Sequence, residues 1–356
     1  MNITLALMVK DCADVLRVTI PSWRKLITSW VILDTGSTDA TEAVVQELLG
    51  DLPGQFIKTH FRDFATSRNE LMALAEGKGD YLLIPDADEQ LNVHGLLPEL
   101  GHECYMVRFE GALDWRRPML IRGDMSFKYF GVCHEYLAKA DGTLPTRTNL
   151  DAITMTHLGS GTTIDKNLRN LTLLEQGLKD EPTNPRYIFY LAQTHFEGGR
   201  FAEALGWYRQ RVEAGGWEEE VFYAHYRAGL CLSMLGKWPE AEETLLRAWE
   251  GRPTRIEPLL HIARHYREAG LYHTGLVFAR RCMEAAYPTD VLFVERAIYL
   301  WEAPLELGIC HYWTGNHKEA IRINDQIIAH PETPKEYKEG AARNTAHSRK
   351  ALSKGK

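Results

Sequence analysis

Hydrophobic and polar positions follow two different patterns, which change near residue 160. Before it, short apolar runs alternate with turn-forming residues and with helical patterns. Such runs are typical of strands, and strands that alternate with helices pair in parallel within an α/β sheet. The predicted strands span residues 3–9, 30–34, 56–61, 81–86 and 104–111. The first and fourth runs are apolar at nearly every position, which favours central strands covered on both faces.

After residue 160, amphipathic helical patterns run almost to the end of the chain and repeat along it. Each repeat has two small residues and a turn glycine between them, which suits two helices in close contact. The small-residue pairs are Ala192 and Ala204, Gly229 and Ala241, Ala263 and Gly275, and Gly308 and Ala320. The glycines are Gly199, Gly236, Gly270 and Gly315. This pattern resembles tetratricopeptide repeats, whose period is about 34 residues, with an insertion expected at 288–304.

The two patterns predict three parts of the chain. Residues 1–165 form an α/β domain, and residues 166–334 form an all-α domain of helical repeats. Residues 335–356 are basic and poor in large apolar side chains, so we expect a flexible, solvated tail.

Composition narrows the class of protein. A net charge of -7 argues against a surface coated with basic residues for non-specific binding to nucleic acid. No apolar run reaches the roughly 18 residues of a membrane span, and the N-terminal segment lacks the basic start of a signal peptide. Six scattered cysteines are typical of reduced thiols. We therefore expect a cytoplasmic protein.

A carboxylate at the end of a strand is the first candidate for chemistry. In VILDTGSTDAT (31–41), Asp34 ends a predicted strand, and a polar turn leads into the next predicted helix. Ligands bind at the carboxyl ends of the strands in an open α/β sheet. Asp34 is therefore expected to face a ligand, although a capped strand-to-helix loop would use the same residues.

A second acidic segment ends the predicted strand at 81–86. Asp86 and Asp88 are separated by one residue, so both side chains point the same way from an extended backbone. Carboxylates at a strand end can hold a hard divalent cation, which then bridges phosphate oxygens. Arg68, on the helix before this strand, strengthens the interpretation because phosphates also need cationic partners.

These motifs occur in an order that resembles the family-2 inverting glycosyltransferases. Members have a GT-A fold, a Rossmann-like domain with a mostly parallel sheet. The resemblance rests on DTGSTDAT, TSRNELMALA and GDYLLIPDADE. GVCHEYL (131–137) and THLGSGTTIDKNLRN (156–170) resemble segments of the branch with C-terminal tetratricopeptide repeats. Bacteriocin peptide S-glycosyltransferases and phage-type glycosyltransferases are similar in outline. Thr35 stands where many relatives have a second Asp.

The resemblance implies a nucleotide-sugar donor, with UDP as the expected carrier. It places Asp34 at the base or ribose, with Val9 and Lys10 beside it at the end of the first strand. Arg68 would approach the base or the diphosphate.

The resemblance also implies Mn²⁺ or Mg²⁺ as a cofactor. Asp86 and Asp88 would form the acidic metal motif, with Asp88 the more direct ligand, and His157 is the expected later ligand. Lys166 and Arg169 would neutralise the diphosphate when the glycine-containing loop before them closes. A solvated helix face is the alternative interpretation for these two cations.

Inversion requires one base on the acceptor side. We predict Glu135 as this base and keep His134 as the alternative, since a histidine there could also be structural or bind metal. Residues 113–131, which mix aromatic and basic side chains, are a candidate acceptor surface.

The acceptor is expected to be a macromolecule, because helical repeats usually bind peptides or proteins. Protein or peptide is preferred, and a hydroxymethylated base in DNA is the alternative suggested by the basic tail and arginines. A homodimer through the repeats is a further expectation. Two other function classes remain. One is a non-catalytic binding module formed by the repeats. The other is a nucleotidyltransferase, a class that would explain the acidic motif but not CHEYL and THLG.

Overall fold

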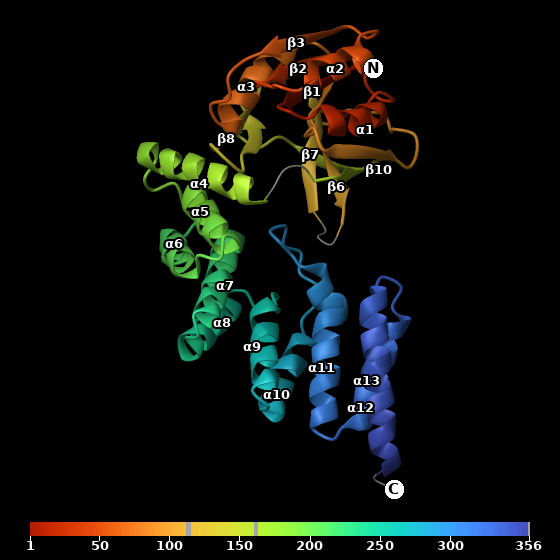
Figure 1. The fold of residues 1–356 in the computed structure, drawn as a ribbon, viewed down its shortest axis with the longest axis vertical. Coiled ribbons are helices and arrows are strands. Elements are labelled where there is room, and N and C mark those ends of the chain that lie inside the picture. Colours follow the sequence, from red (N-terminus) through yellow and green to blue (C-terminus); the bar gives the residue numbers. More distant parts are fainter. Residues whose placement is uncertain (112–114, 160–162, 355–356) are drawn as a thin grey trace. The chain divides into compact units, whose positions relative to one another are not determined.

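The computed structural model describes residues 1–111, 115–159 and 163–354, and it divides into two compact units (Figure 1). The first unit spans Met1–Thr194 and the second His195–Lys356. The boundary lies beyond residue 165, where the sequence pattern had ended the first domain, because the first two helices after the sheet belong to the first unit. These helices are α4 (Thr163–Asp180) and the greater part of α5 (Pro185–Glu197).

The first unit is built on one eight-stranded sheet and a two-stranded ribbon. The strands are β1 (Ile3–Val9), β2 (Ser29–Asp34), β3 (Gly54–Lys58), β4 (Tyr81–Leu83), β5 (Glu89–Val93), β6 (Cys104–Glu110), β7 (Trp115–Arg122), β8 (Phe127–Phe130), β9 (Tyr136–Lys139) and β10 (Arg147–His157). The sheet order is β3-β2-β1-β4-β7-β6-β10-β5, and β8 pairs with β9 in the ribbon.

The two halves of the sheet differ in strand direction. Strands β1 to β4 pair in parallel, as the alternation of strands and helices predicts. In the other half, β7 runs antiparallel to both β4 and β6, and β5 runs antiparallel to β10. Only β6 and β10 pair in parallel there. The sheet is thus mixed, and its parallel half is the part that the sequence pattern identifies.

Helices cover both faces of the parallel half. On one face, α1 (Ala13–Trp23) and α2 (Thr41–Leu49) pack in an apolar cluster with side chains such as Leu5 and Leu7. On the other face, α3 (Phe64–Ala75) packs with Ala6 and its neighbours. Strand β1 is buried along nearly its whole length because both faces are covered.

The second unit consists of antiparallel helix pairs (Figure 1). The helices are α6 (Phe201–Ala214), α7 (Glu218–Met234), α8 (Trp238–Gly251), α9 (Glu257–Glu268), α10 (Tyr272–Cys282), η1 (Ile298–Glu302), α11 (Ala303–Trp313), α12 (His317–Ala329) and α13 (Lys335–Lys354). A Cβ on Gly229 would lie 2.7 Å from Leu245, so the predicted close approach of paired helices is confirmed. The four turn glycines have φ between 72° and 79°, the left-handed conformation that ends a helix.

Two expectations about this unit differ from the structure. The residues between α10 and η1 are 283–297, so the inserted segment begins earlier than expected. The segment expected to be a flexible tail is the helix α13, with Ala341, Thr345 and Ser348 buried. Its buried side chains are small, which is why a segment with few large apolar residues still packs as a helix. Within the described part of the chain, no helix has the length and apolar character needed to cross a membrane.

Candidate functional site

The ends of β1 and β2 lie side by side, as the sequence predicts. Val9 is paired with Asp34 in the parallel register. The amide and hydroxyl of Thr35 both donate to the Val9 carbonyl, at 3.0 and 3.1 Å. Thr35 is thus buried and joins the two strand ends, a role for which a hydroxyl suffices. Lys10, the next residue of the first strand end, is exposed.

Asp34 is buried and holds the turn that follows it. Its Oδ1 accepts hydrogen bonds from the Ser37 amide at 2.9 Å and the Ser37 hydroxyl at 2.6 Å, and a longer one from Gly36. Asp11 fixes the same turn from the β1–α1 loop, since its Oδ1 accepts from the Thr38 amide at 2.7 Å. Both carboxylates thus have a structural part, because they hold the turn between β2 and α2. Contact between Asp34 and a nucleoside stays a prediction.

The acidic motif lies in a turn and not at the end of an extended strand. Strand β4 ends at Leu83, and the Glu89 amide donates to the Asp86 carbonyl at 3.1 Å. The expectation that Asp86 and Asp88 point the same way is therefore wrong, because a turn rotates successive side chains apart. Asp86 contacts arginines, whereas Asp88 lies near His157.

Two arginines hold Asp86. Arg68, on α3, donates to Oδ1, and Arg117, on β7, donates to Oδ2 at 2.6 Å. Arg117 also donates to Oε2 of Glu89 at 2.6 Å, and that oxygen accepts from the Asp86 amide as well. Burial by itself would raise the pKa of Asp86, but Arg117 and Arg68 outweigh it and hold the pKa well below its usual range. Asp86 is thus a fixed anion.

Glu135 joins this network through Arg68. The Nε of Arg68 donates to Glu135 Oε1 at 2.5 Å, and both side chains are nearly buried. Arg68 therefore links the acidic motif with the CHEYL motif, two segments that the sequence could connect only by resemblance. The Arg68 guanidinium also lies over the ring of Tyr129, 5.1 Å from its centroid.

His134 points to a different environment from its neighbour Glu135. Its ring stacks on Tyr190 of α5, with centroids 4.0 Å apart and planes 7° from parallel. Protein packed around the ring, together with Arg186 and Arg169, lowers the pKa of His134 to about 4. The imidazole is therefore neutral near pH 7 and a weak base.

Asp88 and His157 form the candidate metal centre. The Asp88 Oδ1 and His157 Nδ1 atoms are 3.7 Å apart, at the junction of β5 and the end of β10. A carboxylate oxygen and an imidazole nitrogen are both ligands that Mn²⁺ accepts, and these two atoms would have to approach by about 0.7 Å to be adjacent ligands of one octahedral ion with bonds of about 2.1 Å. Mg²⁺-type ions keep their remaining positions for water and phosphate oxygens. The residues present thus fit such an ion. Among the described residues, no group of three or more His, Cys, Asp or Glu side chains has metal-binding geometry.

The two cations predicted to neutralise a diphosphate lie on α4. Arg169 stands over the ring of Phe64, with its Cζ 4.8 Å from the centroid, and Lys166 is half-buried on the same helix. Residues 160–162 of the loop that was expected to close lie outside the described residues. Closure stays a prediction.

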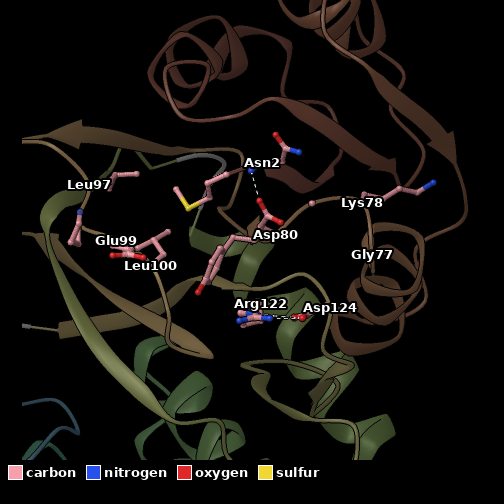
Figure 2. A pocket seen from close by; sticks show the side chains of 13 residues that line it. Asn2, Gly77, Lys78, Asp80, Leu97, Glu99, Leu100, Arg122 and Asp124 are labelled. Atoms are coloured by element: carbon pink, nitrogen blue, oxygen red, sulfur yellow. Dashed lines mark hydrogen bonds and ion pairs between the residues drawn. The ribbon is translucent and has the colours of Figure 1, made fainter.

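A cavity of about 830 Å³ lies at the opposite end of the central strands, beside the residues that precede β1 and β4 (Figure 2). Figure 2 shows Asn2, Asp80, Arg122 and Asp124 around it, in the pairs Asn2–Asp80 and Arg122–Asp124. Asn2 and Asp80 precede β1 and β4. Arg122 ends antiparallel β7, and Asp124 follows it. The cavity therefore contains none of the residues predicted to bind the donor or the metal or to act as the base, and Arg122 and Asp124 are its members from the candidate acceptor surface, 113–131.

Sequence reasoning missed three contributors to the site. Glu89 lies next to Asp88 in the acidic motif, but no role is assigned to it from the sequence. Arg117 is included only as part of the candidate acceptor surface, 113–131. Arg186, on α5, was not considered, although it donates to the His134 carbonyl at 2.9 and 2.6 Å. The sequence signal for Glu89 was its position beside Asp86 and Asp88, directly after an apolar run.

Two families match separate parts of the chain. Residues 6–102 match Glycosyl transferase family 2, and residues 169–248 match Anaphase-promoting complex, cyclosome, subunit 3. The first match contains Asp34, Arg68, Asp86 and Asp88. It ends before Glu135 and His157.

Relatives with curated names are similar over part of their length. The SPbeta prophage-derived glycosyltransferase SunS of Bacillus subtilis is 25% identical over 200 residues, covering 51% of this chain and 46% of SunS. A TPR repeat-containing protein of Synechococcus elongatus is 34% identical over 91 residues, covering 25% of this chain and 21% of that protein. The chain thus spans less than half the length of either relative. Among solved structures, the TPR protein YrrB, described as having an unusual peptide-binding site, aligns with a TM-score of 0.37 and 15% identity over 51% of this chain and 86% of YrrB.

Proposed function

We propose that this chain, which combines a glycosyl transferase family 2 domain with a TPR-like helical region, is a metal-dependent inverting glycosyltransferase. It moves a hexosyl or pentosyl group from a nucleotide sugar, with UDP the preferred carrier, to a macromolecular acceptor. The observation that carries the proposal is the Arg68 side chain, which joins the acidic motif to Glu135 at the carboxyl end of the sheet. Ligands bind at this end of an open α/β sheet.

Asp88 and His157 would hold Mn²⁺ or Mg²⁺. When bound, the ion supplies positive charge to the leaving diphosphate. Asp86 differs from Asp88 in this proposal, because both of its oxygens accept from arginines. Its part is to orient Arg68 and Arg117, so that their guanidinium groups stay fixed as charge develops on the donor.

The donor site extends along the strand ends from Val9 and Lys10 to Asp34. Asp34 keeps the Ser37 turn in place, and this turn gives the nucleoside a rigid, polar edge to bind. Lys166 and Arg169 supply the remaining cationic groups for the diphosphate.

Glu135 is the proposed base that takes the proton from the acceptor. A general base must reach the acceptor oxygen, and it contributes about 10²–10⁴ to the rate. His134, the alternative, is less suited because its ring is stacked face to face on Tyr190, with the ring centroids 4.0 Å apart. The stacking of its ring on Tyr190 supports a structural part for His134.

A protein or peptide remains the preferred acceptor. The arginines that suggested DNA each pair with a carboxylate: Arg116 with Asp151, Arg117 with Asp86 and Glu89, and Arg122 with Asp124. These pairs reduce the positive charge that a DNA backbone would need. The repeats of the second unit offer the surface that a peptide or a second copy of the chain would bind.

The test is mass spectrometry of the purified protein with Mn²⁺, a panel of nucleotide sugars and candidate peptides. We expect one nucleotide sugar to be consumed, with hydrolysis visible even without an acceptor, and one peptide to gain the mass of the sugar. The product from an α-linked donor should be β-linked. Retention of configuration, or no consumption of any donor while the protein is folded, would contradict the proposal.

A further inference from the structure

Helix α5 reaches into the transferase unit and holds the segment that carries Glu135. Both belong to the first compact unit, Met1–Thr194. The segment 131–135 connects β8 with β9, and its conformation decides where the Glu135 carboxylate points. Its contacts with α5 therefore bear directly on the proposed base.

The backbone of this segment bends sharply at His134. Its φ is +52°, a left-handed conformation that few residues other than glycine adopt. Such a conformation persists only where surrounding contacts hold it. The bend separates the neighbouring side chains, so that Glu135 reaches Arg68 while the ring of His134 lies on Tyr190.

Arg186 supplies the contacts that hold the bend. Its Nε and Nη2 atoms both donate to the His134 carbonyl, at 2.9 and 2.6 Å. Its guanidinium lies over the rings of Tyr136 and Tyr190, with Cζ 5.2 and 4.9 Å from their centroids. Arg186 thus contacts both neighbours of Glu135, His134 and Tyr136. A guanidinium does this because it combines a planar face with a fork of donors.

Other contacts fix the chain before the bend and leave the bend itself to Arg186. Asn69 of α3 bonds both the carbonyl and the amide of Tyr129, at 2.9 and 2.7 Å. The Val132 amide donates to the Tyr187 hydroxyl at 3.3 Å, and a Cβ on Gly177 of α4 would lie 2.9 Å from Val132. The chain is thus anchored at Tyr129 and Val132, on the N-terminal side of the bend, and the next anchor is the pair of hydrogen bonds from Arg186 to the His134 carbonyl.

We propose that Arg186 is a positioning residue, which holds His134 in its left-handed conformation and thereby aims the Glu135 carboxylate at Arg68. The inference rests on the proposed function for its kinetic consequence. It also assigns the first helical pair to the active site, because the helix that carries Arg186 would otherwise be regarded as part of the repeats. Arg186 acts through Glu135 and touches no reacting atom.

The kinetic test compares Arg186→Gln, Arg186→Lys and the control Arg209→Gln. Arg209 is an exposed arginine of α6 that pairs with Glu240 at 3.8 Å. We expect Arg186→Gln to lower kcat for transfer by roughly 10–10², part of the worth of a general base, with the KM for the donor within about threefold. Arg186→Lys should recover part of the loss, and Arg209→Gln should match the wild type. A wild-type kcat in Arg186→Gln would overturn the inference.

The double variant separates positioning from a general structural role. If Arg186 acts through Glu135, adding Arg186→Gln to Glu135→Gln should cost less than about threefold, since effects of coupled residues do not add. Losses that multiply would overturn the inference. Wild-type activity of Glu135→Gln alone would instead remove Glu135 as the base, which is a failure of the proposed function.

A crystal structure of Arg186→Gln decides the geometric claim whatever the activity. We expect a negative φ at His134 and loss of the hydrogen bond between Arg68 and Glu135. If His134 kept its conformation and this hydrogen bond remained, the positioning role would be wrong.

Discussion

Arg68 donates a hydrogen bond to Glu135 across 67 residues of sequence, with 2.5 Å between Nε and Oε1. The same guanidinium holds Asp86. One side chain of α3 therefore fixes the distance between an acidic motif and a second carboxylate. Asp86 and Glu135 bind different nitrogens of this guanidinium. Under the proposed function, Asp86 therefore stays ionised while Glu135 takes the proton of the acceptor.

Arg68→Met should destabilise the first unit by about 3 kcal/mol. Removing one partner of a nearly buried ion pair leaves the other charge desolvated, and the Glu135 side chain is only 11% exposed. Asp86 keeps Arg117, which limits the loss. Urea unfolding would measure it as a lower midpoint at an unchanged slope. Arg68→Lys is the control that keeps the charge without the fork, and it should lose less. A change below 1 kcal/mol in Arg68→Met would contradict this expectation.

Removal of the metal should abolish donor turnover. EDTA should stop the reaction, and Mn²⁺ or Mg²⁺ should restore it. Asp88→Asn and His157→Ala should each weaken Mn²⁺ binding and lower the rate by roughly 10² or more, because the ion is worth several kcal/mol of charge stabilisation. His94→Ala is the matched control, since His94 is an exposed histidine next to β5 that pairs with Glu110 at 3.7 Å. Full activity in EDTA would make the metal proposal wrong.

The parallel half of the sheet and the helical repeats could be predicted because their signals are local. A buried parallel strand is a continuous apolar run, and a close helix pair needs small residues at fixed spacing. Strand β7 lacked such a signal. It contains Pro118, which argues against an interior strand. The structure accommodates Pro118 opposite Met106, at the shift in register between β6 and β7.

The same reasoning explains which parts of the site were found. Asp34, Asp88 and His157 follow or end strands, so their common edge could be inferred from the order of motifs. The contacts of Arg117 with Asp86 and Glu89 could not be predicted, because they depend on the turn at 86–89. Likewise nothing in the sequence near Arg186 indicates that it binds the carbonyl of His134.

Acid should destabilise the first unit partly through Glu103. Hydrogen bonds from Lys139 and from the amide and hydroxyl of Thr146 lower the pKa of this carboxyl from 4.5 to about 2. A lowered pKa in the folded state contributes stability above about pH 4.5, and this contribution is lost as the pH falls toward 2. Glu103→Gln should therefore unfold at a midpoint that changes less between pH 5 and pH 3 than that of the wild type. Equal pH dependence of the two proteins would rule out this contribution.

Arg255→Met should destabilise the second unit by about 3–5 kcal/mol, the usual cost of breaking a buried ion pair. Arg255 is fully buried and pairs with Glu257 at 2.7 Å and with Asp290 at 3.1 Å. It also donates to the carbonyls of Leu292 and Phe293, so it fastens the inserted segment 283–297 to α9.

Thermal unfolding of the second unit would show this loss, and proteolysis should cut first within 283–297. Arg209→Met, at the exposed arginine of α6, should change stability by no more than about 0.5 kcal/mol. Equal stability of the two variants would mean that Arg255 does not hold the segment.

Glu135→Gln tests the base against donor binding. The substitution keeps the shape and the hydrogen bond from Arg68 while it removes the charge. We expect affinity for the nucleotide sugar within a few-fold of wild type, because the strand ends and Asp88 are unchanged, and transfer reduced by roughly 10²–10⁴. Calorimetry of donor binding and a transfer assay measure the two effects separately.

His134→Ala distinguishes the two candidate bases. Because its ring is stacked on Tyr190, the imidazole should contribute little as a base. Removing the ring also removes its stacking on Tyr190. We expect the rate to fall only because the bend before Glu135 becomes less rigid. An inactive His134→Ala protein that still binds donor, beside a Glu135→Gln protein with near wild-type transfer, would move the base to His134. Loss of donor binding in Glu135→Gln would instead place this carboxylate at the nucleotide or the metal, because a base on the acceptor side has no contact with the donor before transfer.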